Sequence, residues 1–240
     1  MKLAQFKALT FDCYGTLIDW ESGLWAALQP LLARGGPKLG RDGTLEEFAR
    51  HESAQQAETP ALRYSDLLAR VHRRLAAAWG VAADDALHAA FGASVPAWPA
   101  FPDSAEALAY LKKHYRLVIL SNVDRASFAG SARRLGVAFD AVYTAEDIGS
   151  YKPDPRNFAY LVEHVRKDLG LGPEAILHTA QSLFHDHVPA ARAGLARCWI
   201  DRRQALGGGS GATMPVADTP KVDFHFPSLA AMAEAHRKGG

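Results

Sequence analysis

Short apolar runs with strand character alternate with helix-like segments over much of this chain of 240 residues, and this alternation restricts its possible folds most strongly. Strands are predicted at residues 6–12, 117–122, 141–144, 176–179 and 197–200, with helices at 103–113, 126–135, 156–167 and 188–193. A strand near 222–226 and a helix at 229–236 complete the pattern. Such alternation predicts a mostly parallel sheet with right-handed crossovers. We therefore expect an α/β fold.

Residues 44–98 break the alternation, because they are rich in Ala, Leu, Arg and Gln and poor in β-branched residues. Thr44 and Glu47 resemble a capping box at the start of one helix, and Pro60 separates that helix from a second one. An all-helical block placed between a first strand and later α/β units predicts an inserted cap. We expect residues 1–20 and 99–240 to form a Rossmann-like, mostly parallel sheet core, and residues 21–98 to form a helical cap.

Charge and composition argue against several classes of partner. Lys and Arg number 27 and Asp and Glu 26, without a basic cluster interleaved with aromatic residues, so we expect no nucleic-acid partner. No apolar run approaches the roughly 18 residues that cross a bilayer, and the N-terminus lacks a signal-peptide profile. We therefore expect no membrane partner and a cytoplasmic location. Cys13 and Cys198 lie far apart in apolar contexts and are predicted to be reduced core thiols. The Gly-rich stretch 207–211 has no phosphate-loop Lys after it and is expected to be a flexible loop without a catalytic role.

Asp12 ends the first apolar run and is followed closely by Gly15 and Thr16, which form a turn sequence. Ligands of open α/β sheets bind at the carboxyl edge, where this strand would deliver the carboxylate. A buried carboxylate there is a candidate covalent nucleophile, because it attacks carbon or phosphorus without first losing a proton. The alternative is an ordinary turn-forming Asp.

Three further segments bring polar residues toward the same edge. Ser121 and Asn122 end a predicted strand, where they supply a hydroxyl and an amide, although such a pair is also common as a helix cap. Lys152 lies in a loop beside Pro153, which restricts the backbone, whereas a lone loop lysine is usually solvated. Asp186 follows the strand at 176–179 and would come near enough to pair with Lys152 and orient a water molecule. Convergence of these groups favours a catalytic site.

The ordered segments FDCYGTL, SN, YKPDP and a Ser-x-x-x-Asp turn, with a helical insert after the first, resemble the haloacid dehalogenase superfamily over nearly the whole chain. The branch that the chain resembles is that of the type II 2-haloacid dehalogenases, because Tyr14 stands two residues after Asp12. Phosphatases of the superfamily carry a second Asp there, as a general acid. Tyr14 cannot supply an ordinary carboxyl proton at neutral pH.

The resemblance implies an (S)-2-haloacid dehalogenase that converts short 2-haloalkanoic acids to 2-hydroxy acids through an aspartyl ester. Asp12 would be the nucleophile, Lys152 would hold its carboxylate, and Asp186 would position water. Thr16 and Ser121 would donate hydrogen bonds. The resemblance also implies a homodimer and neither a cofactor nor a metal, although weak magnesium binding stays open.

The resemblance further implies a substrate and halide site. Backbone amides after Asp12, at Cys13 and Tyr14, would bind the substrate carboxylate. An Arg of the cap cradles the halide in such enzymes, and the surrounding helix places Arg50 there with Asn122 as its partner; the alternative is a solvated Arg50.

Four residues depart from the pattern of the best-known dehalogenases: Phe158 replaces a Tyr, Gln181 a Ser, Leu183 an Asn, and His185 a bulky aromatic residue of the halide pocket. His185 either donates a hydrogen bond to a small leaving group such as fluoride or is only a polar residue of its turn. His51 and His185 do not form a metal pair, since neither has ligand spacing with another His or Cys.

Two other functions compete with dehalogenation. The first is a phosphatase or another small-molecule hydrolase of the superfamily that uses Asp12. The second is a non-catalytic binding protein on the same scaffold. The combination of Asp12, Lys152 and Asp186 argues against the latter, because burying such charges is costly without a catalytic need.

Overall fold

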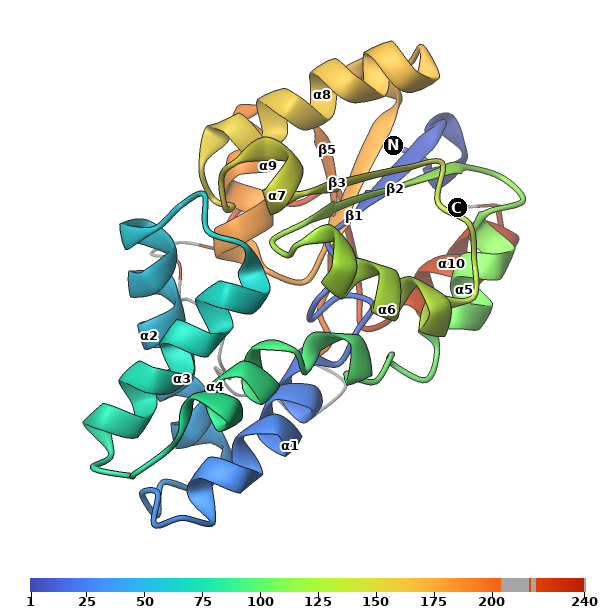
Figure 1. Ribbon diagram of the computed structural model, residues 1–240. Coiled ribbons are helices and arrows are strands. Elements are labelled where there is room, and N and C mark those ends of the chain that lie inside the picture. Colours follow the sequence, from blue (N-terminus) through green and yellow to red (C-terminus); the bar gives the residue numbers. More distant parts are fainter. Residues whose placement is uncertain (204–215, 217–218, 240) are drawn as a thin grey trace.

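The computed structural model describes residues 1–203, 216 and 219–239 (Figure 1). Within these residues, six strands form one sheet in the order β3-β2-β1-β4-β5-β6. The strands are β1 (Ala8–Phe11), β2 (Arg116–Ser121), β3 (Ala141–Thr144), β4 (Ile176–Ala180), β5 (Ala196–Ile200) and β6 (Phe224–Phe226). Every neighbouring pair is parallel. The predicted α/β class is therefore confirmed.

The register of β1 explains how the first apolar run reaches the centre of the sheet. Phe11 lies opposite Ile119 of β2 and Thr179 of β4, and all four residues of β1 are buried. A strand buried on both faces needs a continuous apolar run. Because the strands are parallel, residues that follow their carboxyl ends gather at one edge.

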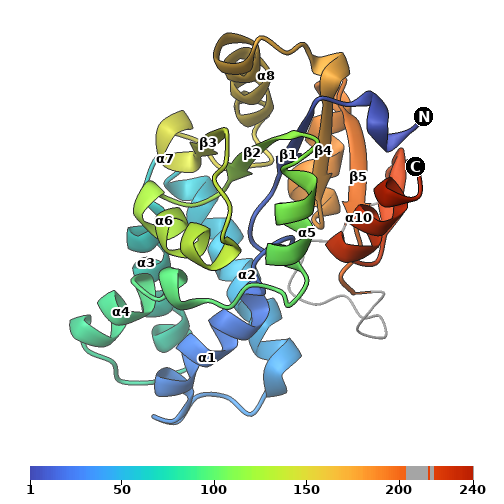
Figure 2. The same ribbon diagram turned by 90° about the vertical axis from the view of Figure 1, so that its right-hand side faces the viewer.

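Helices cover both faces of the sheet (Figure 2). Residues such as Leu9, Phe11 and Ile119 face a large core shared with α5 (Ser104–Leu111), α6 (Arg125–Leu135) and α10 (Leu229–Arg237). Ala8 and Val118 face a second core shared with α8 (Pro155–Leu169) and α9 (Val188–Arg192). The alternation follows the two-residue period of a strand.

Four helices occupy the segment between β1 and α5 and pack on one another beside the carboxyl edge of the sheet (Figure 1). They are α1 (Trp20–Leu32), α2 (Gly40–Glu58), α3 (Tyr64–Ala78) and α4 (Asp85–Gly92). An all-helical insert is thus present, while its division from the core at residues 20/21 and 98/99 stays a prediction. The predicted capping box is wrong. Helix α2 begins one turn earlier, and the Thr44 hydroxyl donates to the carbonyl of Gly40 at 2.6 Å.

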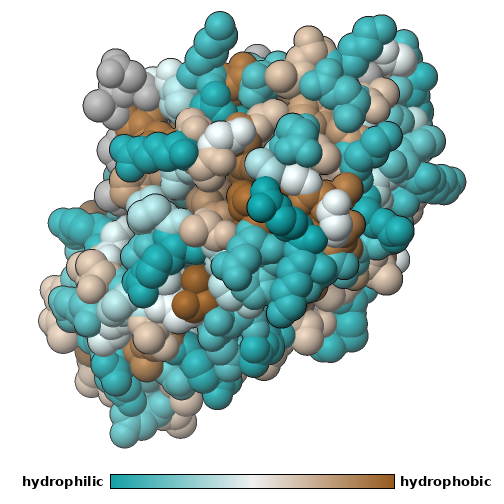
Figure 3. All heavy atoms as spheres, turned by 90° about the horizontal axis from the view of Figure 1, so that it is seen from above, coloured by the Kyte–Doolittle hydropathy of each residue, from teal (hydrophilic) through white to brown (hydrophobic). Residues whose placement is uncertain are grey.

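The short helical segments that were not predicted include α7 (Ala145–Ile148) and the π-helical turn Leu183–His187 after β4. The Gly-rich stretch 207–211 lies outside the described residues. Within the described residues, no helix is long and apolar enough to cross a membrane. Seen from the α8 side, the surface is mainly hydrophilic with separate hydrophobic patches (Figure 3). The cytoplasmic location and the homodimer stay predictions.

Candidate active site

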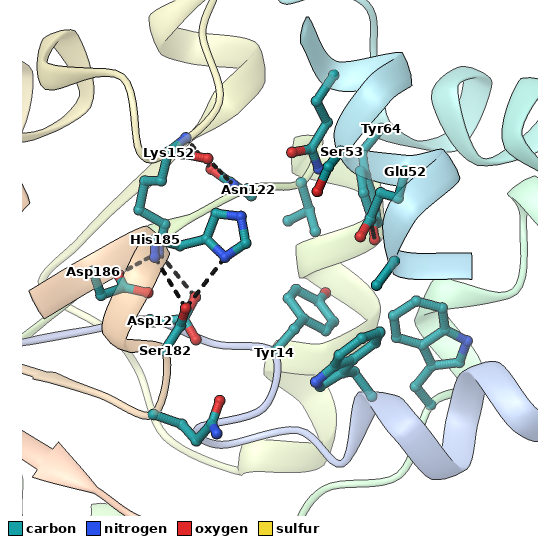
Figure 4. A pocket seen from close by; sticks show the side chains of 16 residues that line it. Asp12, Tyr14, Glu52, Ser53, Tyr64, Asn122, Lys152, Ser182, His185 and Asp186 are labelled. Carbon is teal, nitrogen blue, oxygen red and sulfur yellow. Dashed lines mark hydrogen bonds and ion pairs between the residues drawn. The ribbon is translucent and has the colours of Figure 1, made fainter. Parts of the chain in front are cut away.

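Three predicted residues form one buried cluster at the carboxyl edge of the sheet (Figure 4). The ammonium of Lys152 donates to Asp12 Oδ1 at 2.9 Å, to Asp186 Oδ1 at 2.7 Å and to the carbonyl of Leu120 at 3.0 Å. Asp12 directly follows β1, and Asp186 lies in the π-helical turn after β4. All three N–H donors of the ammonium are therefore used, which stabilises a charge that is otherwise costly to bury.

The same contacts shift the pKa values of the cluster. Burial acts to lower the pKa of Lys152, but Asp12 and Asp186 outweigh it, and the pKa lies above its usual value. Burial acts to raise the pKa of Asp186, yet Lys152 and His178 bring it well below the usual range. For Asp12, burial outweighs the opposing effect of Lys152, so its pKa is raised. The arrangement fixes an ammonium beside an ionised Asp186.

The loop after β1 presents Asp12 to the pocket. Thr16 donates from its hydroxyl to Asp12 Oδ2 at 2.8 Å and accepts a hydrogen bond from the backbone N–H of Gln181 at 2.9 Å. Gly15 makes the turn with a φ of +93°, which favours glycine. The buried guanidinium of Arg202 donates to the carbonyl of Thr16 at 3.1 and 2.8 Å. Sequence reasoning missed Arg202, because its contact spans 186 positions of the chain.

Asn122 lies in the pocket wall but acts on Lys152 rather than on Arg50. Its amide donates to the carbonyl of Lys152 at 3.0 Å, and its oxygen accepts from the Lys152 N–H at 2.7 Å. The paired bonds hold the loop that carries the ammonium. Ser121 ends β2, and its buried hydroxyl has no hydrogen-bond partner within the described residues. That hydroxyl is available as a donor, and its predicted contact with substrate stays a prediction.

Tyr14 lines the pocket, whereas the side chain of Cys13 is buried in the large core. The Tyr14 hydroxyl pairs with that of Ser131 at 2.8 Å. Burial raises the pKa of Tyr14 well above its usual value. The phenol is therefore unsuited to proton donation as an ordinary acid near neutral pH. Substrate binding by the backbone N–H groups of Cys13 and Tyr14 stays a prediction.

Arg50 is not in the pocket, which corrects its predicted place beside the halide. Its guanidinium pairs with Glu47 at 3.0 Å, and its side chain is 72% exposed. The pocket face of α2 consists of Ala49, Glu52, Ser53 and Gln56. Because successive helical residues turn by about 100°, Arg50 lies about 200° around the helix from Glu52 and faces solvent.

His178 on β4 is a buried member of the site that sequence reasoning missed. Its Nε2 lies 3.0 Å from Asp186 Oδ1, and its Nδ1 lies 2.9 Å from the hydroxyl of Thr10. Because ionised Asp186 only accepts hydrogen bonds, His178 Nε2 carries the hydrogen. Phe158 packs its ring edge-on against the imidazole, with 5.0 Å between the ring centroids. The signal available in the sequence was a histidine within the predicted strand at 176–179.

The family model for haloacid dehalogenase-like hydrolases matches residues 6–179. The chain belongs to this family. An (S)-2-haloacid dehalogenase of Pseudomonas putida is 26% identical over 212 residues, covering 84% of this chain and 87% of that protein. An (S)-2-haloacid dehalogenase of Pseudomonas sp. (strain YL) is 28% identical over 212 residues, covering 82% and 83%. A solved defluorinating L-2-haloacid dehalogenase shares the fold, with a TM-score of 0.79, 20% identity and 98% coverage of both chains.

In this haloacid dehalogenase-like hydrolase, the residues of the last motif that differ from the best-known dehalogenases do not all lie in the pocket. His185 and Gln181 line the pocket, but Leu183 does not. Nδ1 of His185 lies 3.2 Å from the Ser182 hydroxyl in its own turn. Burial lowers the pKa of His185 to about 4, so the imidazole is neutral near pH 7. His185 thus belongs to the pocket wall and to the turn, and both predicted roles stay open.

Magnesium in phosphatases of this superfamily is held by the nucleophile, a carbonyl and an acidic residue of the last motif. Here Gln181 provides an amide where an Asp often begins that motif, and the ammonium of Lys152 lies between Asp12 and Asp186. These residues do not fit a magnesium ion bridging two carboxylates. Among the described residues, no group of three His, Cys, Asp or Glu side chains could hold a metal ion. Metal-independent activity stays a prediction.

Proposed function

We propose that this hydrolase is an (S)-2-haloacid dehalogenase that converts short 2-haloalkanoic acids to 2-hydroxy acids. The observation that carries the proposal is Asp12, held in the pocket by Lys152 and Thr16, with Tyr14 where a phosphatase has its acid. A cavity of about 90 Å³ suits a substrate of few heavy atoms. The names of the relatives support the same reaction.

In the first step, a carboxylate oxygen of Asp12 attacks C2 of the haloacid from the side opposite the halogen. The new C–O bond forms as the carbon–halogen bond breaks, and halide leaves with the bonding electron pair. Configuration at C2 is inverted, and the product is an ester on Asp12. Lys152 and Thr16 hold the carboxylate in place, which supplies much of the orientation that such a step needs.

In the second step, water attacks the carbonyl carbon of the Asp12 ester. Asp186 is the group placed to orient this water. Its Oδ1 accepts from Lys152 and His178, while its buried Oδ2 has no partner within the described residues. As the water attacks, one of its protons passes through Oδ2 of Asp186 to the substrate oxygen, and the bond between that oxygen and the Asp12 carbonyl carbon breaks. The 2-hydroxy acid leaves, and the other proton of the water is released to solvent. Asp12 is regenerated for another turnover.

The test is intact-mass measurement after incubation with a panel of short 2-haloacids, together with halide release. We expect wild-type protein to release halide without added metal and to form a transient adduct. The matched Asp12→Asn variant keeps the size of the side chain but cannot attack as a carboxylate, so it should form no adduct. If no halide is released and no adduct forms with any substrate of the panel, the dehalogenase assignment is refuted.

One observation favours a second candidate, a phosphatase that uses the same nucleophile. Glu52 lines the pocket, and burial raises its pKa to about 7. A neutral carboxyl could protonate a leaving alcohol in place of the acid that Tyr14 lacks. Phosphate release from small phosphate esters, without halide release from haloacids, would favour this function.

A further inference from the structure

One face of α2 supplies the helical side of the pocket, through Ala49, Glu52, Ser53 and Gln56. These residues recur at the spacing of a single helical face. Glu52 is the ionisable residue among the four, and its carboxyl is turned into the pocket across from Asp12 and Lys152 (Figure 4). Its position follows from the same helical phase that sends Arg50 to solvent.

The carboxyl of Glu52 has one polar partner within the described residues. The phenol of Tyr64 donates to Glu52 Oε1 at 2.6 Å. No described Lys or Arg forms an ion pair with Glu52. Burial therefore raises the pKa of Glu52 to about 7, against the lowering effect of the Tyr64 hydrogen bond.

The pocket holds more acidic than basic groups for an anionic substrate. Lys152 is the only Lys or Arg among the described lining residues, and its N–H donors already serve Asp12, Asp186 and the Leu120 carbonyl. A substrate carboxylate would add another negative charge to this low-dielectric space. An ionised Glu52 would oppose that charge, whereas a neutral Glu52 offers it a hydrogen-bond donor.

We propose that Glu52 is a specificity-determining residue: as a neutral acid it donates a hydrogen bond from Oε2 to the carboxylate of a 2-haloacid, and as a carboxylate it excludes that substrate. The proposal rests on the proposed dehalogenase function. Tyr64 donates to Oε1 and thereby leaves Oε2 as the oxygen that carries the proton. Above its pKa, Glu52 loses this proton and haloacid binding weakens.

The phenols and imidazoles near Glu52 have pKa values that are shifted away from neutral pH. Burial raises the pKa values of the surrounding phenols above their usual value, and burial lowers the pKa of His51 and brings that of His185 to about 4. Asp12, Lys152 and Asp186 form the ion cluster across the pocket. These groups are Tyr14, Tyr64 and Tyr151, His51 and His185, and the three members of the ion cluster.

The first experiment compares pH profiles of kcat/KM for halide release from 2-chloropropionate. For wild type we expect a fall of about tenfold per pH unit above pH 7, mainly through KM, since one ionisation removes the donor. Glu52→Gln keeps a neutral donor and should be flat there. Glu58→Gln, the same change at an exposed site of α2 that pairs with Arg74, should follow wild type. A flat wild-type profile, or a Glu52→Gln profile that falls as steeply, would overturn the proposal.

The second experiment measures proton uptake on binding propionate, which has no halogen to displace, by calorimetry in buffers of different ionisation enthalpy. At pH 8 we expect wild type to take up about one proton per propionate bound, since Glu52 must be protonated first. Glu52→Gln should take up none, and neutral propionamide should cause no uptake in either protein. Equal uptake by both proteins, or no propionate binding at pH 6, would overturn the role of Glu52. Proton uptake that depends on Glu52, without halide release at any pH, would support Glu52 and refute the dehalogenase function alone.

Discussion

Lys152 shows how much of the site follows from residue chemistry. A side chain that is 1% exposed keeps its charge only when its donors are paired, and here two carboxylates and a carbonyl accept them. Residues that follow the carboxyl ends of parallel strands gather at one edge of the sheet, and the sequence therefore predicts that Asp12, Lys152 and Asp186 lie close together. The sequence does not reveal His178 or Arg202 as their supports, because those contacts depend on strand pairing and on chain segments far apart.

His178 is expected to act on the second chemical step as a positioning residue for Asp186. In His178→Phe the hydrogen bond to ionised Asp186 is lost, and such bonds contribute about 1.5–3 kcal/mol. Ester hydrolysis should therefore slow by about tenfold or more, while ester formation changes little, so the Asp12 adduct should accumulate. Rapid-quench mass measurement of adduct formation and decay separates the two steps.

The control for this prediction is His164→Phe, which changes a histidine of α8 that stacks on Tyr160 outside the pocket. It should leave both steps unchanged. Thr10→Val removes the hydroxyl beside Nδ1 of His178 and should slow hydrolysis less than His178→Phe does. Equal slowing of ester formation and hydrolysis in His178→Phe would mean that the residue supports the fold rather than Asp186.

At the scale of elements, the phase of α2 decides which of its side chains line the pocket. The sequence around Arg50 predicted its position along the helix correctly. It did not predict the helical face on which Arg50 lies. The spacing of Ala49, Ser53 and Gln56 with Glu52 marks the buried face. The residue of α2 that faces the pocket is therefore Glu52 and not Arg50, two positions earlier. The pocket contains a carboxyl in place of the expected guanidinium, which changes its electrostatics.

Helix α1 is expected to be sensitive to a single methyl group at Gly23. A Cβ there would lie 2.3 Å from Cγ of Trp98, a residue of the pocket wall. Ala usually stabilises a helix interior by about 1 kcal/mol relative to Gly. In Gly23→Ala, overpacking of about 1–3 kcal/mol should outweigh that gain. Urea unfolding should show a net loss of stability, and haloacid KM should rise as Trp98 is displaced.

The matched change Gly43→Ala tests the same gain in α2 without the clash. Its Cβ would meet only Cβ of Leu39, at 3.2 Å, and Leu39 is 47% exposed and able to move. This variant should be as stable as wild type or more stable. If Gly23→Ala were also more stable than wild type, the contact between α1 and Trp98 would not be packed closely enough to oppose the added methyl group.

For the whole molecule, alternation along the chain was enough to predict the parallel sheet, because each strand carries its own apolar run and each crossover its own helix. The bounds of β3 coincide with the predicted ones, and those of β4 differ by one residue. The central place of β1 could not be read from the sequence, since pairing with β2 and β4 depends on contacts between distant segments. The turn Leu183–His187 was missed because its π-helical geometry leaves no clear periodic pattern.

The insert and the sheet core are expected to unfold together. One continuous buried cluster contains Leu9 and Phe11 of the sheet as well as Leu67 and Leu75 of α3. In Trp199→Phe the remaining four tryptophans, Trp20, Trp25, Trp79 and Trp98, all lie within residues 20–98. Their fluorescence therefore reports on the insert, while far-ultraviolet circular dichroism reports on the whole chain. Shared burial should give both signals the same urea midpoint, as in wild type. A fluorescence transition at lower urea than the dichroism transition would mean that the helices α1–α4 unfold as a separate cap.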